Sequence, residues 1–242
     1  LYVRTFHMDG NTLAQRTVTL TFEGVDSCFY VFLNDAFVGY SQVSHMTSEF
    51  DVTKYLAVGE NILKVLVFKW CDGSYLEDQD KFRFSGIFRE VYLLARDRVH
   101  VTDLFARTAL SEGFQHADLD VEVSLSGKAT VSCRLTDARG DEIASDASEL
   151  DGHGNLHFTV DHPALWSDET PTLYRLYLHC GDEYICLPIG FREVRIDSGV
   201  LLINGKKVKA KGVNRHDSHP YLGAATPYDH MLHDLCLLKQ FN

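Results

Sequence analysis

The sequence lacks the marks of several large protein classes, and each absence excludes one of them. No apolar run approaches the roughly 20 residues that a membrane-spanning helix needs. The first residues, Leu1-Tyr2-Val3-Arg4, have no signal-peptide layout and no initiator Met. Glycine-rich nucleotide-binding loops and the G-x-S-x-G serine motif are also missing. With 23 basic against 34 acidic residues the net charge is −11, so we expect no nucleic-acid or membrane partner.

Cysteine is present but not in a pattern that binds metal or forms a disulfide framework. None of the six cysteines forms a C-x-x-C pair, and each lies in an apolar or strand-like stretch. This pattern predicts reduced, buried thiols in a cytoplasmic protein. Cys180 and Cys186 flank the turn Gly181-Asp182 and could face each other across a hairpin, so a disulfide there is the less favoured alternative.

Most of the sequence is typical of β-strands. The stretches Thr17–Phe22, Cys28–Asn34 and Asn61–Trp70 are rich in β-forming residues, and the first and last alternate between apolar and polar positions. Turn signals such as Glu23-Gly24 and Val58-Gly59 separate them. Short strands at this spacing predict an antiparallel β-sandwich.

A second strand series follows the charged break at residues 95–98. Roughly seven strands in about 100 residues fit an immunoglobulin-like sandwich, although the Cys…Trp…Cys spacing of antibody domains is absent. Trp166 lies in a connecting loop, and we expect its ring to plug one end of this sandwich. The expected strands are 100–108, 117–125, 129–135, 156–160, 173–180 and 183–191.

The last section, residues 198–242, is predicted to contain a helix as well as strands. Asn204-Gly205 is a strong hairpin signal, and the following segment predicts a strand that ends at Asn214-Arg215-His216. A helix is then predicted, with Thr226 as N-cap, Pro227 in its first turn and an apolar stripe of Met231, Leu235 and Leu238. Strand followed by helix is the repeat of a (β/α)8 barrel. One repeat cannot close a barrel of about 200 residues or more, so we expect the chain to be an internal piece of a longer protein.

Two stretches carry a family resemblance. "GSYLEDQDKFRFSGIFREV" (73–91) and "INGKKVKAKGVNRHDSHP" (203–220) resemble signature stretches of family 2 glycoside hydrolases, in particular β-galactosidases. "EFDVTKYLAVGEN", "WSDETPTLYRL" and "IGFREVRI" resemble the same family in the same order. The resemblance implies a mainly β chain in three parts: a partial jelly-roll sugar-binding domain (1–97), an immunoglobulin-like β-sandwich (98–197) and the truncated start of the (β/α)8 catalytic barrel (198–242).

The resemblance also gives the acid-rich loop a role. It implies that Asp80 binds galactosyl hydroxyls and a sodium ion. A carboxylate suits both ligands, because it accepts several hydrogen bonds and is a hard oxygen ligand for a hard cation. We expect the neighbouring acids Glu77 and Asp78 to pair with arginines or backbone donors. A plain solvated loop is the alternative interpretation that the residues alone favour.

Aromatic residues and a glycine turn are expected to hold this loop in place. Tyr75, Phe82 and Phe84 would wedge it against the domain. Ser85-Gly86 would allow a tight return into a strand at residues 87–94.

The resemblance further implies that His216 contacts the galactose ring and helps to stabilise the transition state. An imidazole can donate or accept a hydrogen bond and can stay neutral beside carboxylates. Its position at the expected end of a barrel strand favours this role over a purely structural one. Arg215 is expected to anchor neighbouring carboxylates by bidentate pairing. His219 is the third residue after His216, but no third ligand is near in sequence, so zinc is not expected.

The catalytic pair is expected elsewhere. Retaining glycosidases need two carboxylates about 5 to 5.5 Å apart, and in this family both are glutamates that would lie beyond Asn242. The magnesium ligands of the family would mostly lie there too. We therefore expect this chain to hydrolyse nothing alone, and the intact enzyme to be a homo-oligomeric β-galactosidase of carbohydrate metabolism. Another family 2 enzyme (β-glucuronidase or β-mannosidase) and a non-catalytic carbohydrate-binding module are the alternatives.

Overall fold

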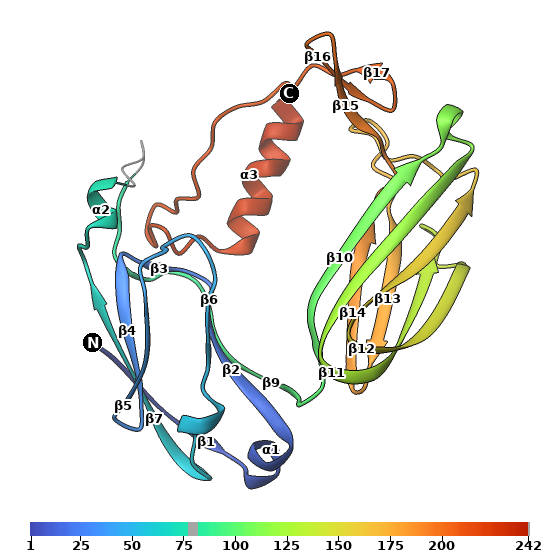
Figure 1. The fold of residues 1–242 in the computed structure, drawn as a ribbon. Coiled ribbons are helices and arrows are strands. Elements are labelled where there is room, and N and C mark those ends of the chain that lie inside the picture. Colours follow the sequence, from blue (N-terminus) through green and yellow to red (C-terminus); the bar gives the residue numbers. More distant parts are fainter. Residues whose placement is uncertain (77–81, 242) are drawn as a thin grey trace. The chain divides into compact units, whose positions relative to one another are not determined.

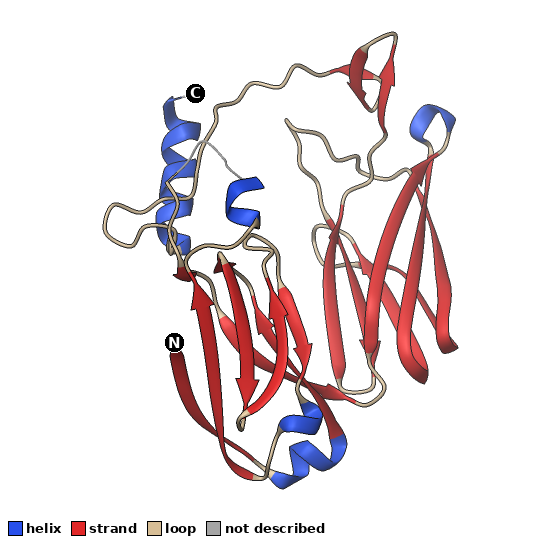
Figure 2. Ribbon diagram, turned by 60° about the vertical axis from the view of Figure 1, so that its left-hand side comes forward, coloured by secondary structure: helices blue, strands red, loops and turns tan. Residues whose placement is uncertain are grey.

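The structure is a computed structural model that describes residues 1–76 and 82–241 (Figure 1). Strands dominate it, as Figure 2 shows, and α3 is its one long helix among the described residues. The elements are β1 (Tyr2–Met8), α1 (Gly10–Gln15), β2 (Arg16–Phe22), β3 (Val25–Asp26), β4 (Cys28–Leu33), β5 (Ala36–Ser41), β6 (Ser48–Asp51), the 3-10 turn Thr53–Tyr55, β7 (Gly59–Phe68), α2 (Gly73–Leu76), β8 (Gly86–Ile87), β9 (Val91–Asp97), β10 (Val101–Leu110), the 3-10 turn Glu112–Phe114, β11 (His116–Thr136), β12 (Glu142–Asp161), β13 (Tyr174–Cys180), β14 (Glu183–Ile189), β15 (Val194–Asp197), β16 (Val200–Ile203), β17 (Lys206–Lys207) and α3 (Tyr228–Phe241).

The chain forms two compact units. Residues 1–95 and 213–242 make the first, and residues 96–212 make the second. The segment after residue 197 is thus shared between the two units. The three domain boundaries drawn from the sequence stay predictions.

The first unit is a sandwich of two antiparallel sheets, ordered β1-β7-β4-β5 and β6-β2-β9. The alternation seen in the sequence explains it: Val18, Leu20 and Phe22 of β2 are at most 2% exposed, and so is every second residue of β4 from Phe29. The rings of Phe22 and Phe29 meet across the two sheets with centroids 4.8 Å apart. Apolar side chains from both sheets therefore form one core, as expected for a sandwich.

The second unit is the predicted immunoglobulin-like sandwich, built from fewer and longer strands. β11 and β12 have 21 and 20 residues and pair along most of their length, with a register shift between Ser124 and Lys128. The two stretches expected as separate strands at 117–125 and 129–135 are therefore one bent strand. Trp166 is half-buried at a loop bridge with Pro171, and Arg192 lies 4.6 Å from its ring centroid.

The cysteine prediction is partly wrong. All six are free thiols and Cys28, Cys133 and Cys180 are buried, but Cys186 and Cys236 are exposed. The alternative of a disulfide at the β13–β14 turn is not realised. Cys180 lies on the core face of β13, whereas Cys186 pairs with Tyr177 further along the hairpin, so the two thiols are not opposite each other.

The third section confirms the hairpin and the helix but not the strand between them. Asn204 and Gly205 have φ of 50° and 72° and join β16 to β17, as the sequence predicts. Residues 208–218 form no strand. A strand needs a hydrogen-bonded neighbouring strand. The N–H of Val208 donates to the carbonyl oxygen of Leu201 at 3.0 Å, but no strand within 1–76 and 82–241 forms a ladder with this segment. No helix among these residues is both long and apolar enough to cross a membrane.

Candidate functional site

A cavity of about 680 Å³ lies in the first unit. Three stretches far apart in the sequence form it: the region of β3 and β5, the second half of the acid-rich stretch, and the polar segment before α3. Its lining residues are Asp26, His45, Phe82, Phe84, Ser85, Phe88, Arg89, Arg215, His216, Asp217, Ser218 and Ala224. The two signature stretches of the sequence thus meet at one hollow.

Short backbone pairing places the acid-rich stretch at this hollow. β8 pairs with β3, with Asp26 opposite Gly86. Gly86 has φ of 114°, a conformation that a residue with a Cβ rarely adopts, so the predicted role of this glycine in the return turn is confirmed. Gly24 allows a second close approach, because a Cβ there would lie 2.6 Å from Cζ of Phe88. Both glycines bring the backbone near enough for the aromatic lining to form.

The expected aromatic wedge is largely wrong. Tyr75 and Phe82 are 79% and 81% exposed, so neither is packed into the sandwich. Phe84 does make a close contact, since a Cβ on Gly223 would lie 2.9 Å from its ring. Tyr75 lies in the short helix α2, and Phe82 and Phe84 lie in a loop, so no sheet face directs these rings inward. Phe82 and Phe84 line the cavity instead, together with Phe88.

Arg215 anchors carboxylates, as predicted. Its Nε and Nη2 donate to Oδ2 of Asp234 in α3, at 3.1 and 2.6 Å, and its Nη1 donates to Asp217. The hydrogen bond from Arg215 holds the pKa of Asp234 below its ordinary value, against the opposing effect of burial. Arg89 approaches Asp217 from the other side, with 4.0 Å between Nη2 and Oδ2. We call Arg89, Asp217, Arg215 and Asp234 the clamp.

His216 lies between two residues of the clamp in sequence. It lines the cavity and is exposed to it, although it does not end a strand as expected. The clamp holds its neighbours on both sides, so the backbone of His216 is fixed without a sheet. His219 plays a different part, because its Nδ1 accepts hydrogen bonds from the backbone N–H groups of Tyr221 and Leu222, both at 3.2 Å. It supports the turn before α3.

Asp80 lies outside the described residues, as do Glu77 and Asp78. Their predicted roles therefore stay predictions. Within the described part of the chain, no three His, Cys, Asp or Glu side chains gather as a metal site needs. The carboxylates of Asp26 and Asp217 line the cavity, but Asp217 is already paired with two arginines. The described residues thus do not by themselves fit a sodium or magnesium ion.

Among the lining residues that were not predicted from the sequence, four carry ionisable side chains: Asp26, His45, Arg89 and Asp217. Arg89 and Asp217 lie inside the two signature stretches. A search for charged residues within those stretches would therefore have found both. Asp26 ends the two-residue strand β3 and His45 lies in a turn, and nothing in the local sequence marks either residue. The hydroxyl of Ser44, the neighbour of His45, donates to Oδ1 of Asp26 at 3.2 Å and so ties the two segments together.

Comparison with known proteins shows the family to which the chain belongs. Residues 1–97 match the model of the glycosyl hydrolases family 2 sugar binding domain, residues 99–192 match that of glycosyl hydrolases family 2, and residues 194–242 match that of the family 2 TIM barrel domain. The chain belongs to glycosyl hydrolase family 2. Its fold is accordingly mainly β, a sugar-binding sandwich and an immunoglobulin-like sandwich followed by the start of a TIM barrel.

Relatives in this family cover the whole chain. It is 47% identical over 243 residues to a beta-galactosidase of Actinobacillus pleuropneumoniae and 44% identical over 242 residues to one of Staphylococcus xylosus. All of the chain is matched, but only 23% and 24% of these relatives. The chain thus spans about a quarter of the length of these curated family 2 enzymes.

Solved structures of other family 2 enzymes share the fold. A beta-glucuronidase of an uncultured Clostridium species superposes with a TM-score of 0.85 at 24% identity, covering 98% of this chain and 42% of that one. A beta-glycosidase from Bacteroides vulgatus also gives a TM-score of 0.85, at 28% identity, over 98% of this chain and 32% of that one. At such identity the glucuronidase is a guide to the fold alone.

Proposed function

We propose that the complete protein is a retaining β-galactosidase and that this chain supplies one side of its substrate site. The observation that carries the proposal is the identity of 44 to 47% to two beta-galactosidases along the entire chain. The substrate would be a terminal β-D-galactoside such as lactose. A cytoplasmic, homo-oligomeric enzyme remains part of the proposal.

The charge of the cavity supports a neutral sugar over a glucuronide. A bound glucuronate carboxylate would need a cationic partner, because a buried or half-buried charge is costly when unpaired. The cationic side chains in the described lining are Arg89 and Arg215, and both pair with Asp217. Asp26 and Asp217 balance the charge of these two arginines, so the described lining has no excess positive charge to attract a carboxylate. This favours β-galactosidase over the β-glucuronidase alternative.

Two residues of this chain would bind the sugar. Asp80 would accept hydrogen bonds from galactosyl hydroxyls and supply one oxygen to a sodium ion. His216, held over the cavity by the clamp, would contact the ring as charge develops on it. The acid/base and the nucleophile would be glutamates that follow residue 242 in the complete protein, so that other residues would cleave the glycosidic bond itself.

The test is substrate choice by the complete enzyme. We expect saturable hydrolysis of an aryl β-galactoside, with aryl β-glucuronide and β-mannoside slower by orders of magnitude. Preference for the glucuronide would overturn the proposal. In a second assay the purified 242-residue chain should show no saturable hydrolysis of nitrophenyl galactoside, and measurable turnover would contradict the placement of the catalytic pair.

A matched pair of variants tests the assignment of Asp80. In the complete enzyme, Asp80→Ala should lower kcat/KM far more than Asp78→Ala, since only the first acid is assigned to sugar and cation. The sodium concentration needed for half-maximal activation should rise only in Asp80→Ala. Equal and small effects of the two changes would show that the acid-rich loop is simply solvated.

A further inference from the structure

A cavity of about 640 Å³ lies on the immunoglobulin-like sandwich of the second unit. Its lining comes from β11, β12, β13 and β14, so one sheet supplies it. The volume falls within the range of about 300 to 1,000 Å³ that is typical of ligand sites. We call this cavity the sandwich pocket; the lining residues that matter most are Ser132, Arg134, Glu142, Tyr177, His179 and Tyr184.

Strand pairing explains the shape of the sandwich pocket. Across β12, β11, β13 and β14, the residues Ala147, Ser132, His179 and Tyr184 stand opposite one another in one row. Both sequence neighbours of Ser132 are buried in the core, and successive side chains of a strand point to opposite faces, so this row lies on the outer face. Small side chains occupy one end of the row and rings the other. The result is a floor of small residues beside an aromatic wall.

Ring contacts hold the aromatic wall together. His179 and Tyr184 stack, with their centroids 4.3 Å apart and an angle of 18° between the rings. In the adjoining row, the guanidinium carbon of Arg134 lies 5.0 Å from the ring centroid of Tyr177, its partner across the two strands. Tyr184 is 77% exposed in spite of its stacking. The wall therefore still presents ring surface to a ligand.

The polar groups of the sandwich pocket include both donors and acceptors. The guanidinium of Arg134 can only donate, whereas the carboxylates of Glu142 and Asp146 can only accept. The hydroxyl of Ser145 donates to Oε1 of Glu142 at 2.8 Å and so orients that carboxylate. Within residues 1–76 and 82–241, Arg134 makes its ring contact but no hydrogen bond or ion pair to the protein. Its donors are thus available to a ligand.

This combination excludes most classes of ligand. An anion would meet two carboxylates against one arginine, and a cation would meet the guanidinium. An apolar molecule would strip water from these charged groups without replacing the lost hydrogen bonds, which is costly. A sugar meets none of these obstacles, because each hydroxyl both donates and accepts. The C–H groups on the face of a pyranose ring are slightly positive and are attracted to the negative face of an aromatic ring.

We propose that the sandwich pocket binds a neutral oligosaccharide. One pyranose ring packs against the stacked rings of His179 and Tyr184. Arg134 donates to hydroxyl oxygens of the sugar, and Glu142 accepts from its hydroxyl groups. The candidate substrate cavity lies in the other compact unit, so the complete protein would bind sugar with both sandwiches. This binding does not depend on the proposed galactosidase activity.

The experiment uses the complete enzyme and a photoreactive probe, a thiolactoside that carries a diazirine. Its sulfur-linked glycosidic bond resists hydrolysis, so catalysis does not consume the probe. After irradiation, mass spectrometry should find the label on peptides that cover residues 142–147 and 177–184. Unlabelled thiolactoside should compete for these positions, whereas inorganic sulfate and tetramethylammonium should not.

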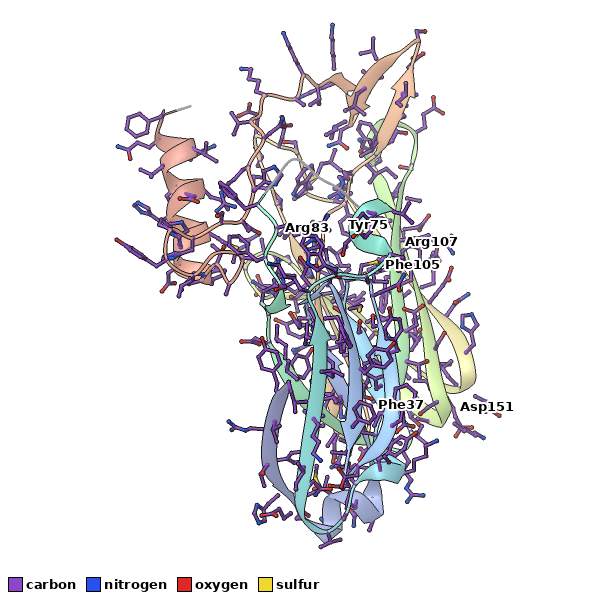
Figure 3. All side chains as sticks on the ribbon, turned by 90° about the vertical axis from the view of Figure 1, so that its left-hand side faces the viewer. Phe37, Tyr75, Arg83, Phe105, Arg107 and Asp151 are labelled. Atoms are coloured by element: carbon purple, nitrogen blue, oxygen red, sulfur yellow. The ribbon has the colours of Figure 1, made fainter. Side chains whose placement is uncertain are left out.

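Two variants and a matched control locate the binding groups. Tyr184→Ala and Arg134→Gln should each raise the probe concentration for half-maximal labelling of these segments by roughly fivefold or more. The control is Phe105→Ala in β10, where Figure 3 labels both Phe105 and Arg107. The guanidinium carbon of Arg107 lies 5.4 Å from the ring centroid of Phe105, a contact like that of Arg134 with Tyr177. Because Phe105 does not line the sandwich pocket, labelling should be unchanged.

The outcomes are distinct. Label absent from both segments would overturn the inference, and so would equal half-maximal concentrations in the wild type and both variants. Competition by sulfate would assign the pocket to an anion and competition by tetramethylammonium to a cation, and either result overturns it. The wild-type label map and its competition decide the question even where a variant fails to fold. An enzyme that hydrolyses no galactoside would reject the proposed function, while the label map would still decide this site.

Discussion

Asn61 offers a sharp test of what holds the sugar-binding sandwich together. It is fully buried at the start of β7, and its amide makes four hydrogen bonds. Oδ1 accepts from the backbone N–H of Ala57 at 2.8 Å and from Nδ2 of Asn34 at 2.8 Å. Nδ2 donates to the carbonyl oxygens of Ala57 and Gly59 at 2.8 and 3.0 Å. One side chain thus ties the turn before β7 to the turn after β4.

The change Asn61→Ala removes all four bonds. At a net contribution of about 1 kcal/mol each, their loss would destabilise the unit by about 4 kcal/mol. Ala57 is exposed and Gly59 is half-buried, so their backbone groups regain bonds to water. We therefore expect the opening free energy of this sandwich to fall by about 2 to 3 kcal/mol. Asn61→Asp should be at least as harmful, because it places a charge in a buried position without its two donors.

The assay is amide hydrogen exchange resolved by peptide. The chain has two compact units, and a single unfolding midpoint would combine the stabilities of both. Protection should fall across β4 and β7 and stay unchanged across β11, which serves as an internal reference. Asn11→Ala, an exposed asparagine of the same unit, should change protection by less than about 0.5 kcal/mol. A similarly small effect of Asn61→Ala would refute the reasoning, as would an equal loss in both units.

Two further outcomes follow from charged contacts. In the complete enzyme, Asp234→Asn should loosen Arg215 and lower kcat/KM by about tenfold or more through misplacement of the neighbouring cavity wall, while Asp229→Asn in the same helix should not. His157 is hydrogen-bonded to Asp120 at 2.7 Å, which raises its pKa despite partial desolvation. The stability from this pair is fully present below the unfolded pKa of about 6.5 and is lost as pH rises through the higher folded pKa. An NMR titration should find the His157 pKa lowered by Asp120→Asn; an unchanged value would contradict this account.

The sequence alone determined features that depend on neighbours along the chain. Alternation set the inward faces of β2 and β4, and Asn204-Gly205 set the β16–β17 hairpin, because both follow from side-chain period and backbone preference within a few residues. Arg215 was expected to bind carboxylates because a guanidinium seldom lies unpaired beside them. The signature stretches also placed the chain in its family.

Only the tertiary structure decided which distant segments meet. The sequence predicts a strand that ends at residues 214–216, but residues 208–218 form none, since a ladder depends on a partner that the local pattern cannot supply. The joining of 117–125 with 129–135 into β11 depends on pairing with β12, and the exposure of Tyr75 depends on what its loop packs against. The cavity and the approach of Arg89 to Asp217 are of the same kind. Each joins residues far apart in the chain, and such contacts are selected by the packing of whole sheets and not by local preference.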